Sequence, residues 1–122
     1  MAIPSTARVF TQALDPSDIL DFYLGLTSGD DGDDLQVGEN VASFQLTLSA
    51  EAVAAGLILM DGGRTRISAN VLGFWLQANA AAQISAIFDG AGVQLPIVFT
   101  YTTDNTPPRT VQRTLVVIGR NQ

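Results

Sequence analysis

The two β-rich runs over residues 95–103 and 110–119 constrain the fold most strongly. Both are rich in valine, isoleucine, threonine and aromatic residues, and apolar side chains alternate along them with a period of two. This alternation is typical of β-strands. The segment between the runs contains Pro107 and Pro108, which cannot continue either strand. The sequence therefore predicts a long antiparallel hairpin over these residues.

Six further stretches have the composition of short strands, and turn residues separate them. They are residues 20–26, 43–49, 57–61, 65–70, 71–78 and 83–89. Residues 50–55 are predicted to form a short helix that ends at Gly56. A helical turn over residues 16–21 is the alternative to a strand at the start of the first stretch. Short strands at a spacing of about ten residues, without a long helix, predict an all-β fold.

Within that class we expect an antiparallel immunoglobulin-like β-sandwich of seven or eight strands, with a closed small barrel as the alternative. Residues 1–14 lack a clean period and contain Pro4, so we interpret them as an N-terminal arm or a short edge element. The sandwich domain would then cover residues 15–122. Trp75 is expected to be the central aromatic residue of the core. The other residues predicted to contribute to the core are Phe44, Leu46, Leu48, Ile97, Phe99, Leu115 and Val117.

The composition excludes several kinds of catalysis. The chain contains no cysteine and no histidine, and all six of its basic residues are arginines. Thiol nucleophiles, thiolate zinc sites, imidazole bases and Schiff-base lysines are therefore excluded. Glycoside hydrolysis needs only carboxylates, but nothing in the placement of the acidic residues suggests it. Asp104, near Arg109 and Arg113, is better interpreted as stabilising a turn. We expect no enzymatic activity and no cofactor.

The net charge of −6 is distributed unevenly along the chain. Residues 1–61 carry ten acidic residues against Arg8 alone, a net charge of −9, whereas residues 62–122 carry five arginines against two aspartates, a net charge of +3. The acidic balance argues against nucleic acid as a partner. The asymmetry allows an acidic face to meet a basic face on another copy or on a neighbouring protein. The alternative is that these charges only solvate separate loops.

The apolar segments of the sequence indicate neither a membrane-spanning helix nor a signal for export. No apolar run approaches the roughly 18–20 residues that cross a bilayer. Residues 1–8 lack the long apolar stretch of a signal peptide. We therefore expect no membrane partner and no export.

Five segments, taken in order, resemble the small immunoglobulin-like domains of tailed-bacteriophage virions, a family of phage fibre, head-decoration and tail-associated proteins. The matching segments are Asp15–Phe22, Gly38–Val41, Ala55–Leu59, Phe74–Leu76 and Gln112–Val117. The chain departs from the family pattern in the stretch after Phe22, which is not rich in aromatic residues, and in the turn at residues 104–109, which lacks the usual glycine. The resemblance brings no catalytic residues with it.

The resemblance implies a non-enzymatic structural protein of the virion. The expected role is decoration or cementing of the capsid exterior, with the major capsid protein or other virion subunits as partners and several copies in each particle. A tail or fibre-base component is the alternative in the same setting. A carbohydrate- or surface-binding β-sandwich module that uses the loops at one end is an alternative of a different class. An exposed tryptophan or tyrosine on a loop would favour it, whereas Trp75 lies within a predicted strand.

The predicted partner-binding residues lie in the N-terminal arm and in the acidic loop over residues 30–34. The arm carries apolar residues without a strand of their own, and the loop concentrates negative charge. Carboxylates around a glycine turn also suit Ca²⁺, but these acids come in adjacent pairs that point apart, so we favour a solvated loop without metal. We expect both segments to stay outside the core. The residues are Ile3, Arg8, Val9, Phe10, Asp30, Asp31, Asp33 and Asp34.

Overall fold

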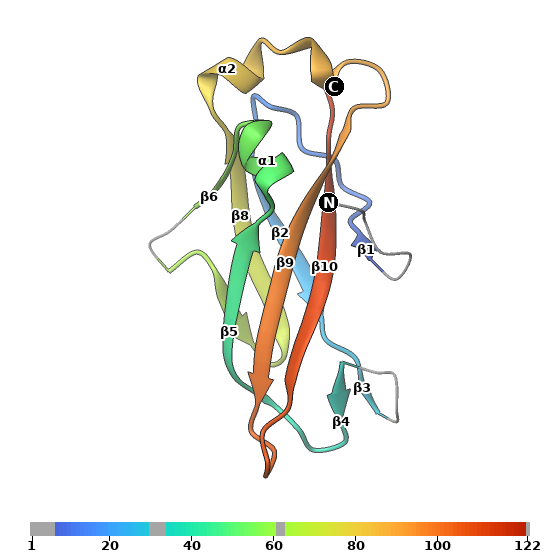
Figure 1. The fold of residues 1–122 in the computed structure, drawn as a ribbon, viewed down its shortest axis with the longest axis vertical. Coiled ribbons are helices and arrows are strands. Elements are labelled where there is room, and N and C mark those ends of the chain that lie inside the picture. Colours follow the sequence, from blue (N-terminus) through green and yellow to red (C-terminus); the bar gives the residue numbers. More distant parts are fainter. Residues whose placement is uncertain (1–6, 30–33, 61–62, 122) are drawn as a thin grey trace.

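The structure is a computed structural model that describes residues 7–29, 34–60 and 63–121. Two β-sheets contain most of the ordered elements (Figure 1). In the first sheet the strand order is β1-β10-β9-β5. Its strands are β1 (Arg8–Val9), β5 (Val41–Leu48), β9 (Val93–Thr103) and β10 (Thr110–Gly119). Strand β1 is parallel to β10, and the other pairs are antiparallel.

The second sheet is built around β8. Strand β2 pairs along one side of β8, while β6 and β7 pair with successive parts of β8, all of them antiparallel. Its strands are β2 (Ile19–Gly25), β6 (Leu57–Leu59), β7 (Arg66–Ser68) and β8 (Val71–Ala78). A small parallel pair, β3 (Ser28–Gly29) and β4 (Leu35–Gln36), lies apart from both sheets. The mostly β architecture is therefore confirmed, and its strands form separate sheets within the described residues.

The short helices gather at one end of the elongated fold, and the turn between β9 and β10 lies at the other end (Figure 1). The helical elements are α1 (Ala50–Ala54), α2 (Ala80–Gln83) and the 3-10 helix η1 (Ala86–Phe88). Each begins at a side chain that caps it: Ser49, Asn79 and Ser85 accept hydrogen bonds from backbone amides two or three residues further on. None of the described helices is long and apolar enough to cross a membrane.

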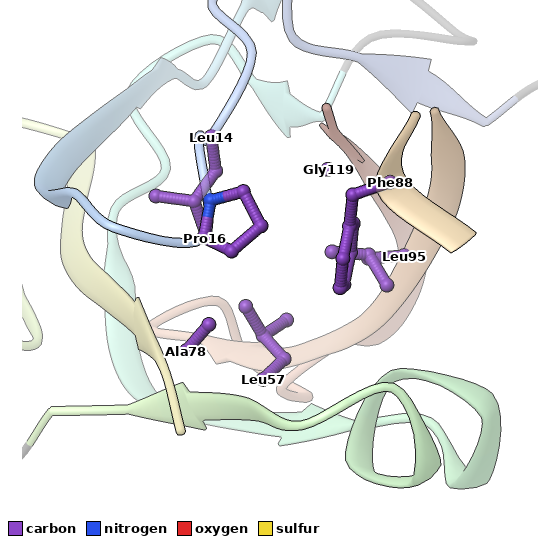
Figure 2. Close-up of a pocket in the computed structure, with 7 residues that line it drawn as sticks. All are labelled: Leu14, Pro16, Leu57, Ala78, Phe88, Leu95 and Gly119. Atoms are coloured by element: carbon purple, nitrogen blue, oxygen red, sulfur yellow. The ribbon is translucent and has the colours of Figure 1, made fainter. Parts of the chain in front are cut away.

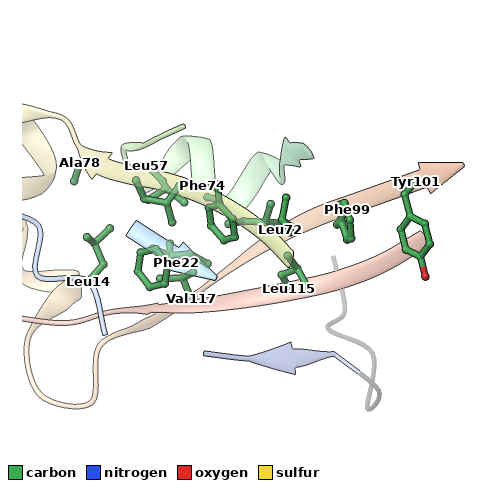
Figure 3. Close-up of a cluster of buried hydrophobic side chains, with 14 of the residues drawn as sticks. Leu14, Phe22, Leu57, Leu72, Phe74, Ala78, Phe99, Tyr101, Leu115 and Val117 are labelled. Carbon is green, nitrogen blue, oxygen red and sulfur yellow. The ribbon is translucent and has the colours of Figure 1, made fainter. Parts of the chain in front are cut away.

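The hydrophobic core lies between the two sheets (Figure 3). Phe22 and Phe74 come from one sheet, and their rings stack at a centroid distance of 5.7 Å. Burial confirms four of the predicted core positions in the hairpin, namely Ile97, Phe99, Leu115 and Val117. Three more predicted positions, in β5, are half-buried and pack against the core, namely Phe44, Leu46 and Leu48. The predicted core residues of the hairpin therefore lie on the face that both strands turn toward the core.

Trp75 does not occupy the core, so its predicted central role is wrong. It lies in β8 between Phe74 and Leu76, which are both fully buried. Because successive side chains of a strand point to opposite faces, Trp75 points to the outer face of its sheet, where it is half-buried. Phe74 takes the central position instead.

The predicted strand over residues 83–89 is also wrong. The chain there forms the end of α2 and then η1. Ile84, which an alternating strand would have placed in the core, is 89% exposed. The capping side chains of Asn79 and Ser85 explain the difference, since they satisfy helical backbone amides.

Part of the N-terminal arm belongs to the folded core. The ring of Phe10 contacts the rings of Phe22 and Phe74 edge-on, at centroid distances of 5.5 and 5.6 Å. Leu14 is buried and exchanges backbone hydrogen bonds with the end of β10. The expectation that the arm stays outside the core is therefore wrong for these two residues. Residues 7–14 form a short edge element, and residues 1–6 of the arm lie outside the described residues.

Candidate functional site

The side chain of Asp34 is the centre of a network of charged groups near the end of the fold that carries the β9–β10 turn. Its exposed fraction is 0%. Both of its carboxylate oxygens accept hydrogen bonds from the guanidinium of Arg8, and Arg113 Nε donates to Oδ1 at 3.2 Å. The backbone amide of Thr27 donates to Oδ2 at 3.0 Å. A buried carboxylate is thus held by two cations and one amide, as burial of a charge requires.

Glu39 forms the second half of this network. Nε and Nη2 of Arg109 donate to its two carboxylate oxygens, in the forked geometry that arginine and carboxylate favour. The backbone amide of Gln36 donates to Oε1 at 2.9 Å. Arg109 also donates to the backbone carbonyl of Asp34 at 3.4 Å, so the two halves are joined.

The hairpin strand β9 contributes the last contact. The hydroxyl of Tyr101, which is buried in the core, donates to the carbonyl of Asp34 at 2.6 Å. Arg8 in β1, Tyr101 in β9 and Arg113 in β10 therefore all converge on one residue between β3 and β4. We call the set Arg8, Asp34, Glu39, Tyr101, Arg109 and Arg113 the Asp34 network.

The pKa values of Asp34, Glu39 and Tyr101 reflect their burial and their hydrogen bonds. Burial raises the pKa of Asp34, but hydrogen bonds from Arg8 and Thr27 outweigh it, and the pKa lies below its usual value. The hydrogen bonds from Arg109 lower the pKa of Glu39 to about 2. Burial raises the pKa of Tyr101. The two carboxylates stay ionised at neutral pH and are committed to their arginines, so neither is poised to take up a proton in catalysis.

The Asp34 network changes the interpretation of the charge asymmetry. Asp34 and Glu39 belong to the acidic first half of the sequence, while Arg109 and Arg113 belong to the basic second half. The structure pairs them inside one chain. These four charges are therefore not available to join one copy to a neighbour.

The predicted partner-binding residues fall into three groups. Asp34 and Phe10 pack into the fold, so the expectation that they lie outside the core is wrong, and Arg8, which was predicted to bind another subunit, contacts Asp34 within the chain. Val9 is 53% exposed at the edge of the first sheet and is open to a partner. Ile3, Asp30, Asp31 and Asp33 lie outside the described residues.

A metal site in the acidic loop is not assembled from the described residues. No group of three or more acidic side chains among them is close enough to hold an ion. Asp34, the one described acid of the loop, has arginines in the place where a metal would bind.

A gap between the sheets near the helical end is lined by apolar residues. Figure 2 shows its lining side chains pointing toward one space. That space is too small to hold a water molecule. The lining residues are Leu14, Pro16, Leu57, Ala78, Phe88, Leu95 and Gly119. The gap carries no acid, base or nucleophile and supports no ligand.

The helical end itself exposes apolar side chains. Val53 in α1, Ile84 after α2 and Ile87 in η1 are all exposed there. Ile87 lines a shallow open hollow of about 160 Å³, together with alanines of α1 and α2. The alanine-rich stretches over residues 50–55 and 78–82 thus meet at this end. We call Val53, Ile84 and Ile87 the apolar end patch.

Comparisons with protein-family models, with curated proteins and with solved structures found no match. The candidate function therefore rests on the residues and the fold of this chain.

Proposed function

We propose that this chain is a non-enzymatic structural protein with an immunoglobulin-like fold, and that it decorates the capsid exterior of a tailed bacteriophage by binding the major capsid protein. The phage setting is supported by the five collinear segments that resemble virion proteins. The structural role is supported by the use of both buried carboxylates in fixed ion pairs.

Strand order supports the immunoglobulin-like assignment. In such domains the strands B, E and D share one sheet, and C, F and G share the other. The order β2-β8-β6 matches B-E-D, with β7 also beside β8, and the order β10-β9-β5 matches G-F-C. Chain order agrees as well, because the sequence visits β2, β5, β6, β8, β9 and β10 in turn. Strand β1 then extends the sheet beyond β10.

The observation that carries the proposal of attachment is the apolar end patch. Ile84 is 89% exposed, and Val53 and Ile87, which are also β-branched and exposed, belong to the helical elements at the same end of the fold. Clustered exposed apolar residues mark protein-binding surfaces. We propose that this end of the sandwich seats against the capsid. Val9, which is exposed at the edge of the first sheet, is a further candidate for contact with a neighbouring subunit.

Repetition strengthens the attachment. A decoration protein meets a site that recurs over the whole shell, so copies that also touch one another gain from multivalency. The sandwich would act mechanically, since expansion of the shell must break these contacts. The Asp34 network keeps the opposite end of the sandwich rigid.

The test is the loading of purified particles that lack this protein. Purified chain is mixed with the particles, and the bound fraction is measured after sedimentation. We expect Ile84→Asp to reduce occupancy at least about tenfold, because a buried unpaired charge costs more than 1.4 kcal/mol. Val37→Asp is the matched control, since Val37 is 81% exposed and follows β4, far from the helices. Equal occupancy of the Ile84 variant and wild type would contradict attachment through this patch.

A further inference from the structure

A hollow of about 160 Å³ lies on the outer face of the second sheet, away from the core and from the apolar end patch. Its size is close to that of a cavity that holds one benzene ring, about 150 Å³. Four strand residues and two residues of the preceding loop line it, namely Tyr23, Arg66, Gly73, Trp75, Gly63 and Arg64. The hollow therefore fits a single six-membered ring.

Two aromatic rings form its apolar part. Tyr23 in β2 lies directly opposite Gly73 in β8. A Cβ atom on Gly73 would lie only 3.0 Å from Cε1 of Tyr23, so the missing side chain lets the tyrosine ring lie across β8. Tyr23 is 57% exposed. Trp75 is two residues further along the same face, because Phe74 and Leu76 on either side of it point into the core.

Polar groups of opposite kind flank the rings. Asp21 lies directly opposite Trp75 in the neighbouring strand. Its carboxylate lies close enough to the Tyr23 hydroxyl to raise the pKa of that phenol. On the other side of β8, Arg66 lies opposite Gly73 and is exposed. No carboxylate among the described residues forms an ion pair with Arg66. Arg66 thus offers donors in the hollow, and Asp21 offers acceptors beside Trp75 without lining the hollow itself.

We propose that this hollow binds one pyranose ring of a neutral saccharide. The C–H face of a sugar packs on Tyr23 and Trp75, while its hydroxyls donate to Asp21 and accept from Arg66. Rigid aromatic side chains supply contact area at a low cost in conformational entropy, and a few polar groups fix the orientation. Asp21 carries a negative charge beside Trp75, and the chain has a net charge of −6, so an anionic ligand such as a nucleotide phosphate is disfavoured in spite of Arg64 and Arg66 in the lining. This binding does not depend on the proposed role in a virion.

The only tryptophan of the chain reports on the site directly. Emission of Trp75 in the full chain is followed during titration with methyl glucoside, methyl galactoside and N-acetylglucosamine. We expect a saturable change with at least one sugar, with a Kd of about 1–10 mM, as suits a single ring in an open site. Absence of any change up to about 50 mM of all three sugars would overturn the proposal. The proposal would also be overturned if uridine or N-acetylglutamate amide bound as tightly as the sugars or more tightly.

Substitutions then locate the binding. Gly73→Ala places a methyl group 3.0 Å from Cε1 of Tyr23, so the tyrosine ring must shift although no polar group is removed, and binding is expected to weaken at least tenfold. Gly25→Ala is its matched control in the same sheet, because nothing lies within 4 Å of a Cβ there. Arg66→Ala removes a charged donor and is expected to weaken binding about tenfold, whereas Arg120→Ala is expected to leave it unchanged. Retained far-UV circular dichroism checks each fold. Equal weakening by the Gly73 and Gly25 variants would overturn the assignment to this hollow.

Discussion

The guanidinium of Arg8 donates hydrogen bonds to both carboxylate oxygens of Asp34, 26 positions further along the chain. Each of these residues is a candidate for binding another subunit when the sequence is considered alone. The structure shows that they bind each other. The contact ties the edge strand β1 to the segment that joins β3 and β4. Charge in this part of the chain therefore stabilises the fold.

Neutralising Asp34 tests how much the network stabilises the fold. We expect Asp34→Asn to lower the free energy of unfolding by about 2–4 kcal/mol, because Arg8 and Arg113 then lose their counter-charge. The value lies toward the lower part of the range for buried pairs, since these two arginine side chains are 31% and 29% exposed and water compensates them in part. Urea denaturation followed by circular dichroism measures it. Asp18→Asn, at an exposed aspartate, is the control and is expected to stay within about 0.5 kcal/mol of wild type.

A double-mutant cycle isolates the contact between Arg8 and Asp34. Residues of one ion-pair network couple, so the loss caused by Arg8→Ala and Asp34→Asn together is expected to be smaller than the sum of the two single losses. The same urea titrations give all four free energies. Additive losses would show that the two side chains act independently, against the geometry described above.

The pKa of Glu39 predicts how stability depends on pH. It is about 2 in the folded chain, against 4.5 for an unperturbed glutamate. A group whose pKa is lowered by folding contributes stability above its unfolded pKa, and that contribution is lost as the pH falls through the folded value. We expect wild type to exceed Glu39→Gln in unfolding free energy above about pH 5, and the difference to shrink between about pH 4.5 and pH 2. A difference of the same size at pH 7 and pH 2 would contradict this role of Glu39.

Truncation of the two neighbouring aromatic residues in β8 tests which face lies inward. Phe74 is fully buried, and we expect Phe74→Ala to cost about 3–5 kcal/mol. Trp75→Ala removes a larger side chain from the outer face and is expected to cost less than half as much. Thermal and urea denaturation of both variants supply the comparison. A larger loss for Trp75 than for Phe74 would reverse the assignment of the two faces.

Patterns with a period of two predicted most of the strands from the sequence, because alternation directly reflects one buried face. The hairpin of β9 and β10 is the clearest case. For Trp75 the period of two did not identify the buried face of the strand. Within the run over residues 71–78 apolar residues occupy both faces, so size alone favoured the tryptophan, and only the pairing of β8 between β2 and β6 decides that Phe74 points inward.

The Asp34 network was missed because its members are distant in sequence. One signal was present: Arg113 is in phase with Leu115 and Val117, which face the core. An arginine at an inward position needs a buried acid. The sequence contains ten aspartates, however, and local pattern does not say which of them folds back onto the hairpin. The strand predicted over residues 83–89 was wrong for a different reason. The side chains of Asn79 and Ser85 cap helical turns, and this capping competes with strand alternation.

The proposed role in a virion is tested most directly by copy number. Under this proposal, purified particles of the encoding phage are analysed by quantitative mass spectrometry, with the major capsid protein as the internal standard. A decoration protein that seats on a repeating site is expected at a fixed ratio to the capsid subunit, which amounts to hundreds of copies in each particle. Absence of the chain from washed particles would contradict decoration of the capsid. So would a handful of copies in each particle, which is the number expected of a tail component.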